Sequence, residues 1–412
     1  MAPSALPFAG VRVVELASEA TAFTGLLFAG QGAEVTVVEP LEGSPTRSFG
    51  PFVEDEVGPD RSLWWRFYNR GKDGVRVDLD RPSGRAELVA LLRDADVLLE
   101  SESTAHLAEV GLEWPDASSR FPRLIWVAMT PFGRQEPRED EPVTDLTMLA
   151  RSGPIWSCGY DDHDLPPVRG GEGHAAHIAG FQAVIGASIA LLARLRSGRG
   201  QRVDVSLTAT GNVTTEMSTY EWLVRRATVQ RQTGRHAQVV ATQPTQVRAR
   251  DGRYVNTGVP RATRTECVVL LHWMDELGVR DEFDDVGLLE IGAQGALPVE
   301  EPAIRTELIG AQRACISLIA RHLDGQVFFV EAQERGLSAG VINAAEDVLT
   351  DPQFEARGMW VEVDEPSLGR SLNYPAAPLA FGGVRAVLGP APSFGGVSFG
   401  ASEAAETATN PD

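Results

Sequence analysis

Short apolar runs alternate with amphipathic stretches along the first 130 residues of the chain. The runs VRVVEL (11–16) and EVTVVE (34–39) have the length and composition of buried parallel strands. Residues 83–93 repeat their apolar positions at helical spacing, which predicts an amphipathic helix. Further strands are expected at 75–79, 96–99 and 123–129, and a further helix at 20–30. Strands that alternate with helices favour a right-handed, mostly parallel sheet, so we predict an α/β fold with a Rossmann-like large domain.

The pattern changes after about residue 225. Residues 246–255 hold Asp251-Gly252 between two alternating segments, which predicts a β-hairpin. Helical patterns follow at 267–277 and 312–323, and GLSAGVIN (336–343) is interpreted as the return to the first domain. The predicted organisation is a large domain at 1–225 and 334–400, a smaller inserted α+β domain at 226–333, and a disordered, small and acidic tail at 401–412.

Residues 178–193 form the longest apolar run. The run is short for a bilayer span and contains Gln182 and Ser188, so a buried core helix is the favoured interpretation. It lies inside residues 180–207, GFQAVIGASIALLARLRSGRGQRVDVSL, which predict a helix, a tight glycine turn and a strand.

Composition narrows the class of protein. The 412 residues carry a net charge of −20, which argues against a nucleic-acid partner and against an anionic membrane surface. Three scattered cysteines form no disulfide framework, and the N-terminus lacks the features of a signal peptide, so we expect a cytoplasmic protein. After the first predicted strand the chain reads Ala-Ser-Glu-Ala instead of GxGxxG, which argues against a nicotinamide or flavin cofactor.

The segment at 180–207 closely resembles the central segment of family III CoA-transferases, the formyl-CoA transferase and carnitine-CoA transferase group. Four other segments resemble that family in the same order along the chain: 10–39, 69–79 (NRGKDGVRVDL), 124–133 (LIWVAMTPFG) and 337–360. The resemblance implies an interlocked dimer of two-domain chains. It also implies coenzyme A or an acyl-CoA as ligand, bound on the large domain, with no covalently bound cofactor.

The family nucleophile is an aspartate four residues before the first glycine of this segment, and here that position is Ala176. In the family this carboxylate attacks the acyl-CoA thioester to give a mixed anhydride, which alanine cannot form. Related racemases pair the aspartate with a histidine, whose position corresponds to Thr144. The resemblance therefore predicts a family scaffold without the family's acid–base or nucleophilic groups.

Three neighbouring side chains are candidates to replace the aspartate. Glu172 is a weak substitute nucleophile or a solvated loop residue, and His174 is a weak candidate proton carrier. His177 is expected to pack or hydrogen-bond locally at the start of the helix. The cluster YDDHDL (160–165) contains metal-ligand types, but adjacent residues cannot all converge on one ion, so we interpret it as an exposed loop and predict no metal site.

Family positions that bind coenzyme A are partly lost. Ser101 stands where the family has an asparagine, and Glu109 stands where it has an arginine, which would replace attraction for phosphate by repulsion. Arg47 and Lys72 keep basic side chains at family positions, with ordinary surface charge as the alternative interpretation.

Three functions remain open at this point. The first is a catalytically silent CoA-transferase subunit, a pseudoenzyme that pairs with an active paralogue or forms a homodimer. The second is an active acyl-CoA enzyme (a transferase, racemase, hydrolase or lyase) that uses another residue. The third is a non-enzymatic binding or regulatory protein on the same fold.

Overall fold

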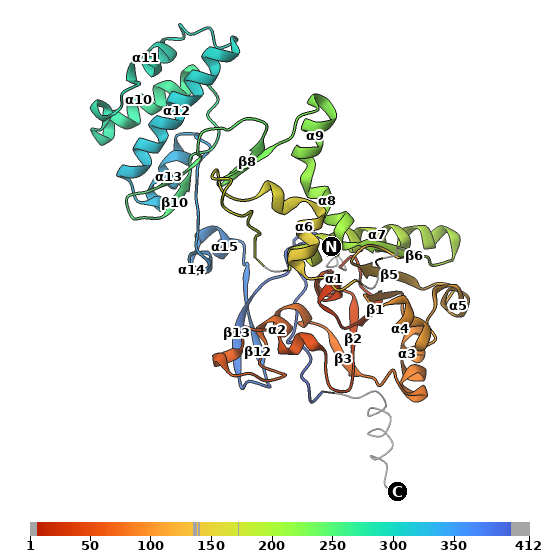
Figure 1. Ribbon diagram of the computed structural model, residues 1–412. Coiled ribbons are helices and arrows are strands. Elements are labelled where there is room, and N and C mark those ends of the chain that lie inside the picture. The colour runs from red at the N-terminus through yellow and green to blue at the C-terminus, as the bar shows by residue number, and fades with distance from the viewer. Residues whose placement is uncertain (1–5, 135–137, 139–140, 172, 397–412) are drawn as a thin grey trace. The chain divides into compact units, whose positions relative to one another are not determined.

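The computed structural model describes residues 6–134, 138, 141–171 and 173–396. The chain divides into two compact units (Figure 1). The first unit holds the described residues up to 155, residues 169–216 and the residues from 352 onward, and the second holds residues 156–168 and 217–351. Glu172 and the tail at 401–412 lie outside the described residues.

A six-stranded parallel sheet forms the centre of the first unit. Its strands are β1 (Arg12–Leu16), β2 (Glu34–Glu39), β3 (Asp73–Arg76), β4 (Val97–Glu100), β5 (Ile125–Thr130) and β6 (Arg202–Ser206). The strand order is β3-β2-β1-β4-β5-β6, with Val14 opposite Thr36 on one side and Leu98 on the other. This order confirms the Rossmann-like prediction, and it places a topological switch point between β1 and β4, where such sheets bind ligands.

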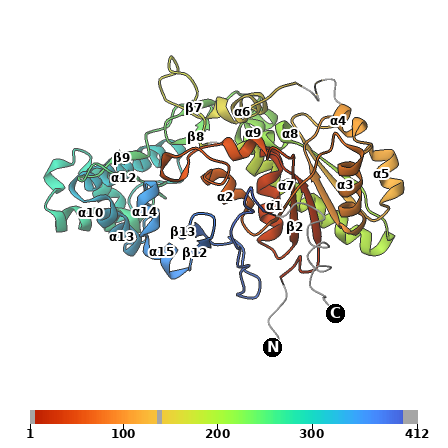
Figure 2. The same ribbon diagram turned by 90° about the horizontal axis from the view of Figure 1, so that it is seen from below.

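Helices cover both faces of this sheet (Figure 2). Helices α1 (Glu19–Ala29) and α7 (His174–Ser197) pack together on one face, where Phe28, Val127 and Ala183 share one apolar core. Helices α3 (Pro82–Asp94), α4 (Thr104–Glu109) and α5 (Trp114–Arg120) cover the other face over a second core, which includes Leu88 and Trp126. The two faces therefore hold separate cores.

Small residues bring α7 close to α1. Ala176, Ala183 and Ala187 lie buried along one side of α7, and a Cβ added to Gly180 would lie 2.9 Å from the Phe23 ring. Gly198, at a φ of +70°, ends the helix before β6 begins, which confirms the predicted glycine turn. Among the described helices, α7 is the one with the length and apolar composition to cross a membrane, and a third of its most apolar window is buried.

One strand prediction needs correction. The third strand is β3 at Asp73–Arg76, not 75–79, although the Val77 N–H still bonds to the Glu39 carbonyl. The chain then turns, because the Asp78 carboxylate accepts from the Asp80 N–H and the next helix begins at Pro82.

Short elements complete the first unit. They are α2 (Leu63–Asn69), α6 (Asp145–Ser152), α8 (Leu207–Asn212), α15 (Pro352–Ala356) and the antiparallel pair β12 (Trp360–Glu365) and β13 (Arg370–Pro375).

The second unit is a helical cluster with small antiparallel sheets. Its helices are α9 (Glu216–Arg225), which starts at the unit boundary, α10 (Arg264–Leu277), α11 (Val286–Gln294), α12 (Pro302–His322), α13 (Gly325–Glu334) and α14 (Ala345–Leu349). Its strands are β7 (Gln230–Gln232), β8 (Arg235–Gln238), β9 (Gln246–Arg248), β10 (Tyr254–Asn256) and β11 (Gly340–Val341). Strands β9 and β10 pair across Asp251-Gly252, which confirms the predicted hairpin.

The unit boundaries differ from those expected from sequence. The segment at 336–343 stays with the second unit, because β11 pairs with β10. Residues 156–168 also belong to this unit, where Asp161 forms an ion pair with Arg235 at 2.7 Å. Residues 161–165 are exposed, as predicted for the YDDHDL loop.

Candidate active site

The start of α7 carries Ala176, the position for which the family resemblance predicts an aspartate. Gly173, at a φ of +82°, lets the backbone turn into the helix, and Ala176 is its third residue. Ala176 is 7% exposed, so a small apolar side chain fills a nearly closed position. The N-terminus of a helix carries free N–H groups and a positive dipole end, which favours a carboxylate there.

A carboxylate does reach this helix end, and it comes from Asp145. Asp145 is the first residue of α6, whose start is fixed by a capping box between Thr144 and Thr147. Its Oδ1 accepts from the Ala175 N–H at 2.8 Å, and its Oδ2 lies 3.3 Å from Arg169 Nη1. Both oxygens are engaged, so Asp145 is held as a cap of α7. Sequence reasoning missed it: the Thr-Asp-Leu-Thr pattern predicts the start of α6, but not that this carboxylate reaches a helix 30 residues further on.

His177 lies in an aromatic cluster beside this helix end. Its Nε2 and the Tyr68 hydroxyl are hydrogen-bonded at 2.7 Å, and its ring centroid lies 4.4 Å from that of Phe23. Burial, followed by the charge of His174, lowers the pKa of His177, and Asp145 opposes this shift. Burial, Glu19 and Asp145 together raise the pKa of Tyr68. The pair is therefore neutral at pH 7, and the predicted local packing of His177 is confirmed.

His174 is the first residue of α7 and is exposed to solvent. Its ring centroid lies 6.5 Å from that of His177, beyond hydrogen-bonding contact. Glu172 lies outside the described residues, so its candidate role stays a prediction.

A crevice of about 520 Å³ lies at the carboxyl ends of β1, β2 and β3, at the switch point of the sheet. Several carboxylates line it: Glu39, Glu42, Asp78, Asp80 and Glu102. Among its described lining residues, the one basic side chain is His106. The position is that of a nucleotide site in such sheets, but its charge is the opposite of what phosphates need.

The basic residues of the sequence prediction are buried and paired inside the unit. Arg47 contacts both oxygens of Glu39, at 2.6 and 2.7 Å. Lys72 Nζ lies 2.7 Å from Glu15 and donates to the Ala22 carbonyl at 2.9 Å. Burial lowers the pKa of Lys72, and the charge of Glu15 opposes the shift. The alternative of ordinary surface charge is wrong for both residues, because each cation neutralises a buried carboxylate.

The other two predicted ligand positions follow β4. Ser101 is half-buried directly after the strand, and Glu109 ends α4 with its side chain 77% exposed, 3.9 Å from His106. Glu109 is not among the residues that line the crevice, whereas Glu102 is. Glu109 therefore adds no charge to the crevice, and its predicted effect on coenzyme A stays a prediction.

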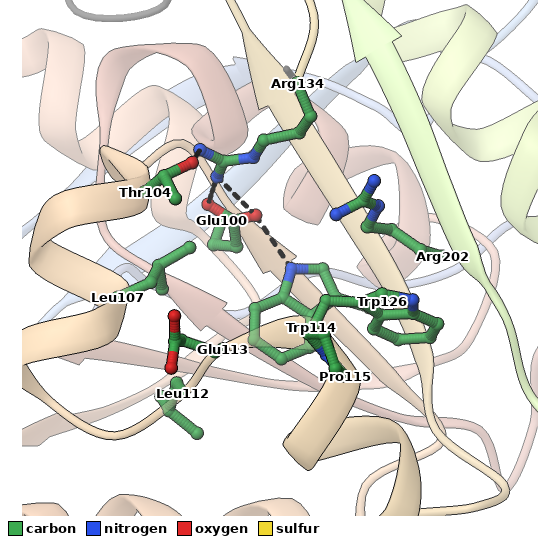
Figure 3. A pocket seen from close by; sticks show the side chains of 10 residues that line it. All are labelled: Glu100, Thr104, Leu107, Leu112, Glu113, Trp114, Pro115, Trp126, Arg134 and Arg202. Atoms are coloured by element: carbon green, nitrogen blue, oxygen red, sulfur yellow. Dashed lines mark hydrogen bonds and ion pairs between the residues drawn. The ribbon is translucent and has the colours of Figure 1, made fainter.

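A second cavity, of about 230 Å³, lies on the sheet face that carries α4 and α5 (Figure 3). Its floor is Glu100, fully buried at the end of β4, which accepts from Arg134 at 2.6 Å and from the Trp126 indole at 2.7 Å. Burial raises the pKa of Glu100, and the two donors oppose that shift. Since the acid and the guanidinium neutralise each other, we interpret this pair as structural.

Comparison with known proteins gives a consistent result. The sequence model described as CoA-transferase family III matches residues 8–397. Succinyl-CoA:(R)-benzylsuccinate CoA-transferase subunit BbsE of Thauera aromatica is 30% identical over 93% of this chain and 90% of its own length. Succinate–glutarate CoA-transferase of Agrobacterium fabrum is 29% identical over 87% and 85%.

Solved structures agree at the level of the fold. A CAIB/BAIF family protein from Brucella suis superimposes with a TM-score of 0.75 at 24% identity, and covers 99% of this chain and 100% of its own.

Proposed function

This chain belongs to CoA-transferase family III, and we propose that it is a catalytically impaired subunit of an enzyme of that family. The function class is the transfer of coenzyme A between acyl-CoA and carboxylic acids. A paralogous chain with the family aspartate supplies the nucleophile, and the two assemble as an interlocked dimer in the cytoplasm. Coenzyme A or an acyl-CoA is the ligand of the assembly.

The observation that carries this proposal is Ala176 at the start of α7. A transferase of this family needs a carboxylate there that can form an anhydride with the acyl group, and a methyl side chain cannot do so. Asp145 does not replace it, because its two oxygens bind the Ala175 N–H and Arg169. A carboxylate that already accepts from two donors is stabilised as an anion and is a weak nucleophile.

The charge of the switch-point crevice supports the same proposal. Coenzyme A carries several phosphate charges. Carboxylates such as Asp80 and Glu102 line the crevice in which these phosphates would lie. Arg47 and Lys72 cannot compensate, since both are buried against carboxylates. We therefore expect this chain to bind coenzyme A weakly, and its partner to bind it well.

An exposed apolar stripe on α7 supports assembly with another chain. Phe181, Ile185, Ile189, Leu192 and Leu195 recur at helical spacing, and each is 52–81% exposed. Contiguous apolar surface of this kind is typical of protein interfaces. Two relatives are themselves named as subunits: BbsE, and the beta subunit of succinyl-CoA–L-malate CoA-transferase of Chloroflexus aurantiacus, which is 32% identical over 49% of this chain.

The test is to purify this chain alone and together with a family III paralogue from the same genome that keeps the aspartate. We expect no transfer from acyl-CoA to a free carboxylic acid by this chain alone, and transfer by the co-purified pair. Replacement of the paralogue's aspartate by asparagine should abolish the activity of the pair. Turnover by this chain alone would contradict the proposal, and a pair that never forms would favour a non-enzymatic binding role or a homodimer.

The Tyr68–His177 pair favours one alternative, acid–base chemistry on an acyl-CoA without an anhydride. This second function predicts exchange of the α-proton of an acyl-CoA in D₂O by the chain alone. Loss of that exchange in His177→Phe, with the fold retained, would support it.

A further inference from the structure

Arg70 is a buried cation without a counter-charge. Arg70 follows the last turn of α2 and is 3% exposed to solvent. Its guanidinium lies over the rings of Phe67 and Tyr374, at 5.0 and 5.2 Å. Within the described part of the chain no carboxylate pairs with this guanidinium, and its Nε is shielded from solvent without a hydrogen-bond partner.

The other buried cations of the first unit are paired with carboxylates. Every other buried side-chain cation there faces a buried carboxylate: Arg47 with Glu39, Arg66 with Glu365, Lys72 with Glu15 and Arg134 with Glu100. An unpaired buried charge is costly, because desolvation is not repaid by an opposite charge. Burial lowers the pKa of Arg70, in keeping with this cost. The described residues of the folded chain therefore provide no anion to pair with Arg70.

Arg70 lines one cavity of about 440 Å³ together with Glu362, Asp364 and Arg385. It also lines a second cavity, of about 170 Å³, which is apolar and lies between α1, α2 and the segment after β13. Phe23, Leu26, Met359 and Leu388 contribute to the walls. Among the described lining residues, Arg70 is the one charged side chain. Protein cavities of about 150 Å³ with apolar walls accept a benzene molecule. The cavity is thus large enough for one small apolar group with an anionic end at Arg70.

We propose that this cavity binds a small carboxylic acid whose apolar body is about the size of a benzene ring. The ring or branched chain fills the space beside Phe23 and Leu26, and the carboxylate accepts two parallel hydrogen bonds from the Arg70 guanidinium. A phosphate ester fits less well, since a dianion needs further donors and the described walls offer none that is charged. The site is separate from the acidic crevice and does not depend on the proposed function.

The probe for this site is benzoate, titrated calorimetrically into the full-length chain. Benzyl alcohol has the same ring without the charge, and benzylamine reverses the charge. We expect saturable binding of benzoate, and no saturable binding of benzyl alcohol or benzylamine. Arg70→Met should weaken it at least about tenfold, the loss of one charge-assisted interaction, and Arg70→Lys should weaken it less. Arg385→Gln is the matched control: its Nη1 already donates to the carbonyls of Arg357 and Gly358, and it lies outside this cavity.

A second measurement separates this role from a structural one. Without ligand, Arg70→Met should keep or raise the unfolding temperature, because it removes an unpaired buried charge. With benzoate, only the chains that keep Arg70 should be stabilised further. No benzoate binding by the wild-type chain, or equal binding by Arg70→Met, overturns the proposal. A shift of Arg70→Met to a smaller species in sedimentation, with no benzoate binding by the wild type, also overturns it, because a protein segment would then cover Arg70.

Discussion

At the first turn of α7, the methyl group of Ala176 lies at a buried position and the carboxylate of Asp145 accepts a hydrogen bond from the helix end. The prediction that Ala176 stands at the family's aspartate position comes from sequence alone, because an ungapped segment fixes its position relative to Gly180. Asp145 could not be found in this way, since its contact with the Ala175 N–H depends on how α6 and α7 pack. Residue identities at a motif can be predicted from sequence, whereas partners that come from elsewhere in the chain need the folded structure.

Ala176→Asp alone should not create an active transferase. The new carboxylate would stand at the family position, but the crevice would still present Asp80 and Glu102 to the phosphates of coenzyme A. We expect transfer no higher than in Ala176→Asn, the matched control, in an assay that follows acyl-CoA and free acid by chromatography. Clear turnover by Ala176→Asp with micromolar affinity for coenzyme A would show that the crevice is functional.

His177 should make stability depend on pH. Its pKa is lowered in the folded chain, so the unfolded chain, with a pKa near 6.5, takes up a proton first as the pH falls. The contribution to stability is complete above about pH 6.5 and is lost below it. In urea unfolding between pH 7.5 and 5.5, His177→Phe should lose stability less steeply than the wild type. His236→Gln, at an exposed position of β8, should keep the wild-type slope. Identical slopes in all three proteins would contradict this role.

Helix α7 shows where prediction of an element succeeds and where it stops. The helix, the Gly198 turn and β6 were all expected from the sequence, and the apolar run was interpreted as a buried core helix. The structure buries the face rich in alanine and exposes the larger side chains, such as Ile189 and Leu195. A helix that is apolar all round gives no sign in its sequence of which side stays open.

The exposed stripe on α7 should control assembly. Ile185→Asp combined with Leu192→Asp places two charges on the stripe without touching the alanine-rich face, so the fold should persist in circular dichroism. We expect the sedimentation coefficient to fall to that of a monomer, and co-purification with a paralogue to fail. Val57→Asp, which is 79% exposed on a loop outside the stripe, should leave the assembly intact. An unchanged assembly in the double variant would exclude this face as an interface.

At the scale of the whole chain, composition predicted repulsion of polyanions, and the structure shows where the carboxylates gather. The net charge of −20 argued against nucleic acids as partners but gave no position for the carboxylates. The sheet order brings the ends of β3, β2, β1 and β4 side by side, and the crevice there is lined with acids that follow β2, β3 and β4. Sequence placed the strands of the sheet except for the bounds of β3, while the convergence of these residues follows from topology.

This charge distribution predicts an unusual response of coenzyme A binding to salt. A basic phosphate site loses affinity as ionic strength rises, because salt screens attraction. Here salt screens repulsion, so the weak affinity of the isolated chain should stay constant or rise between about 20 and 300 mM salt, where the Debye length shrinks through about 10 Å. Ligand-observed NMR can follow coenzyme A, with uncharged pantetheine as the control that should not respond. The paralogue and the assembled pair should show the opposite slope. A steep loss of coenzyme A affinity with salt in this chain alone would mean that buried cations such as Arg47 and Lys72 become available to the ligand, and that its own site is still in use.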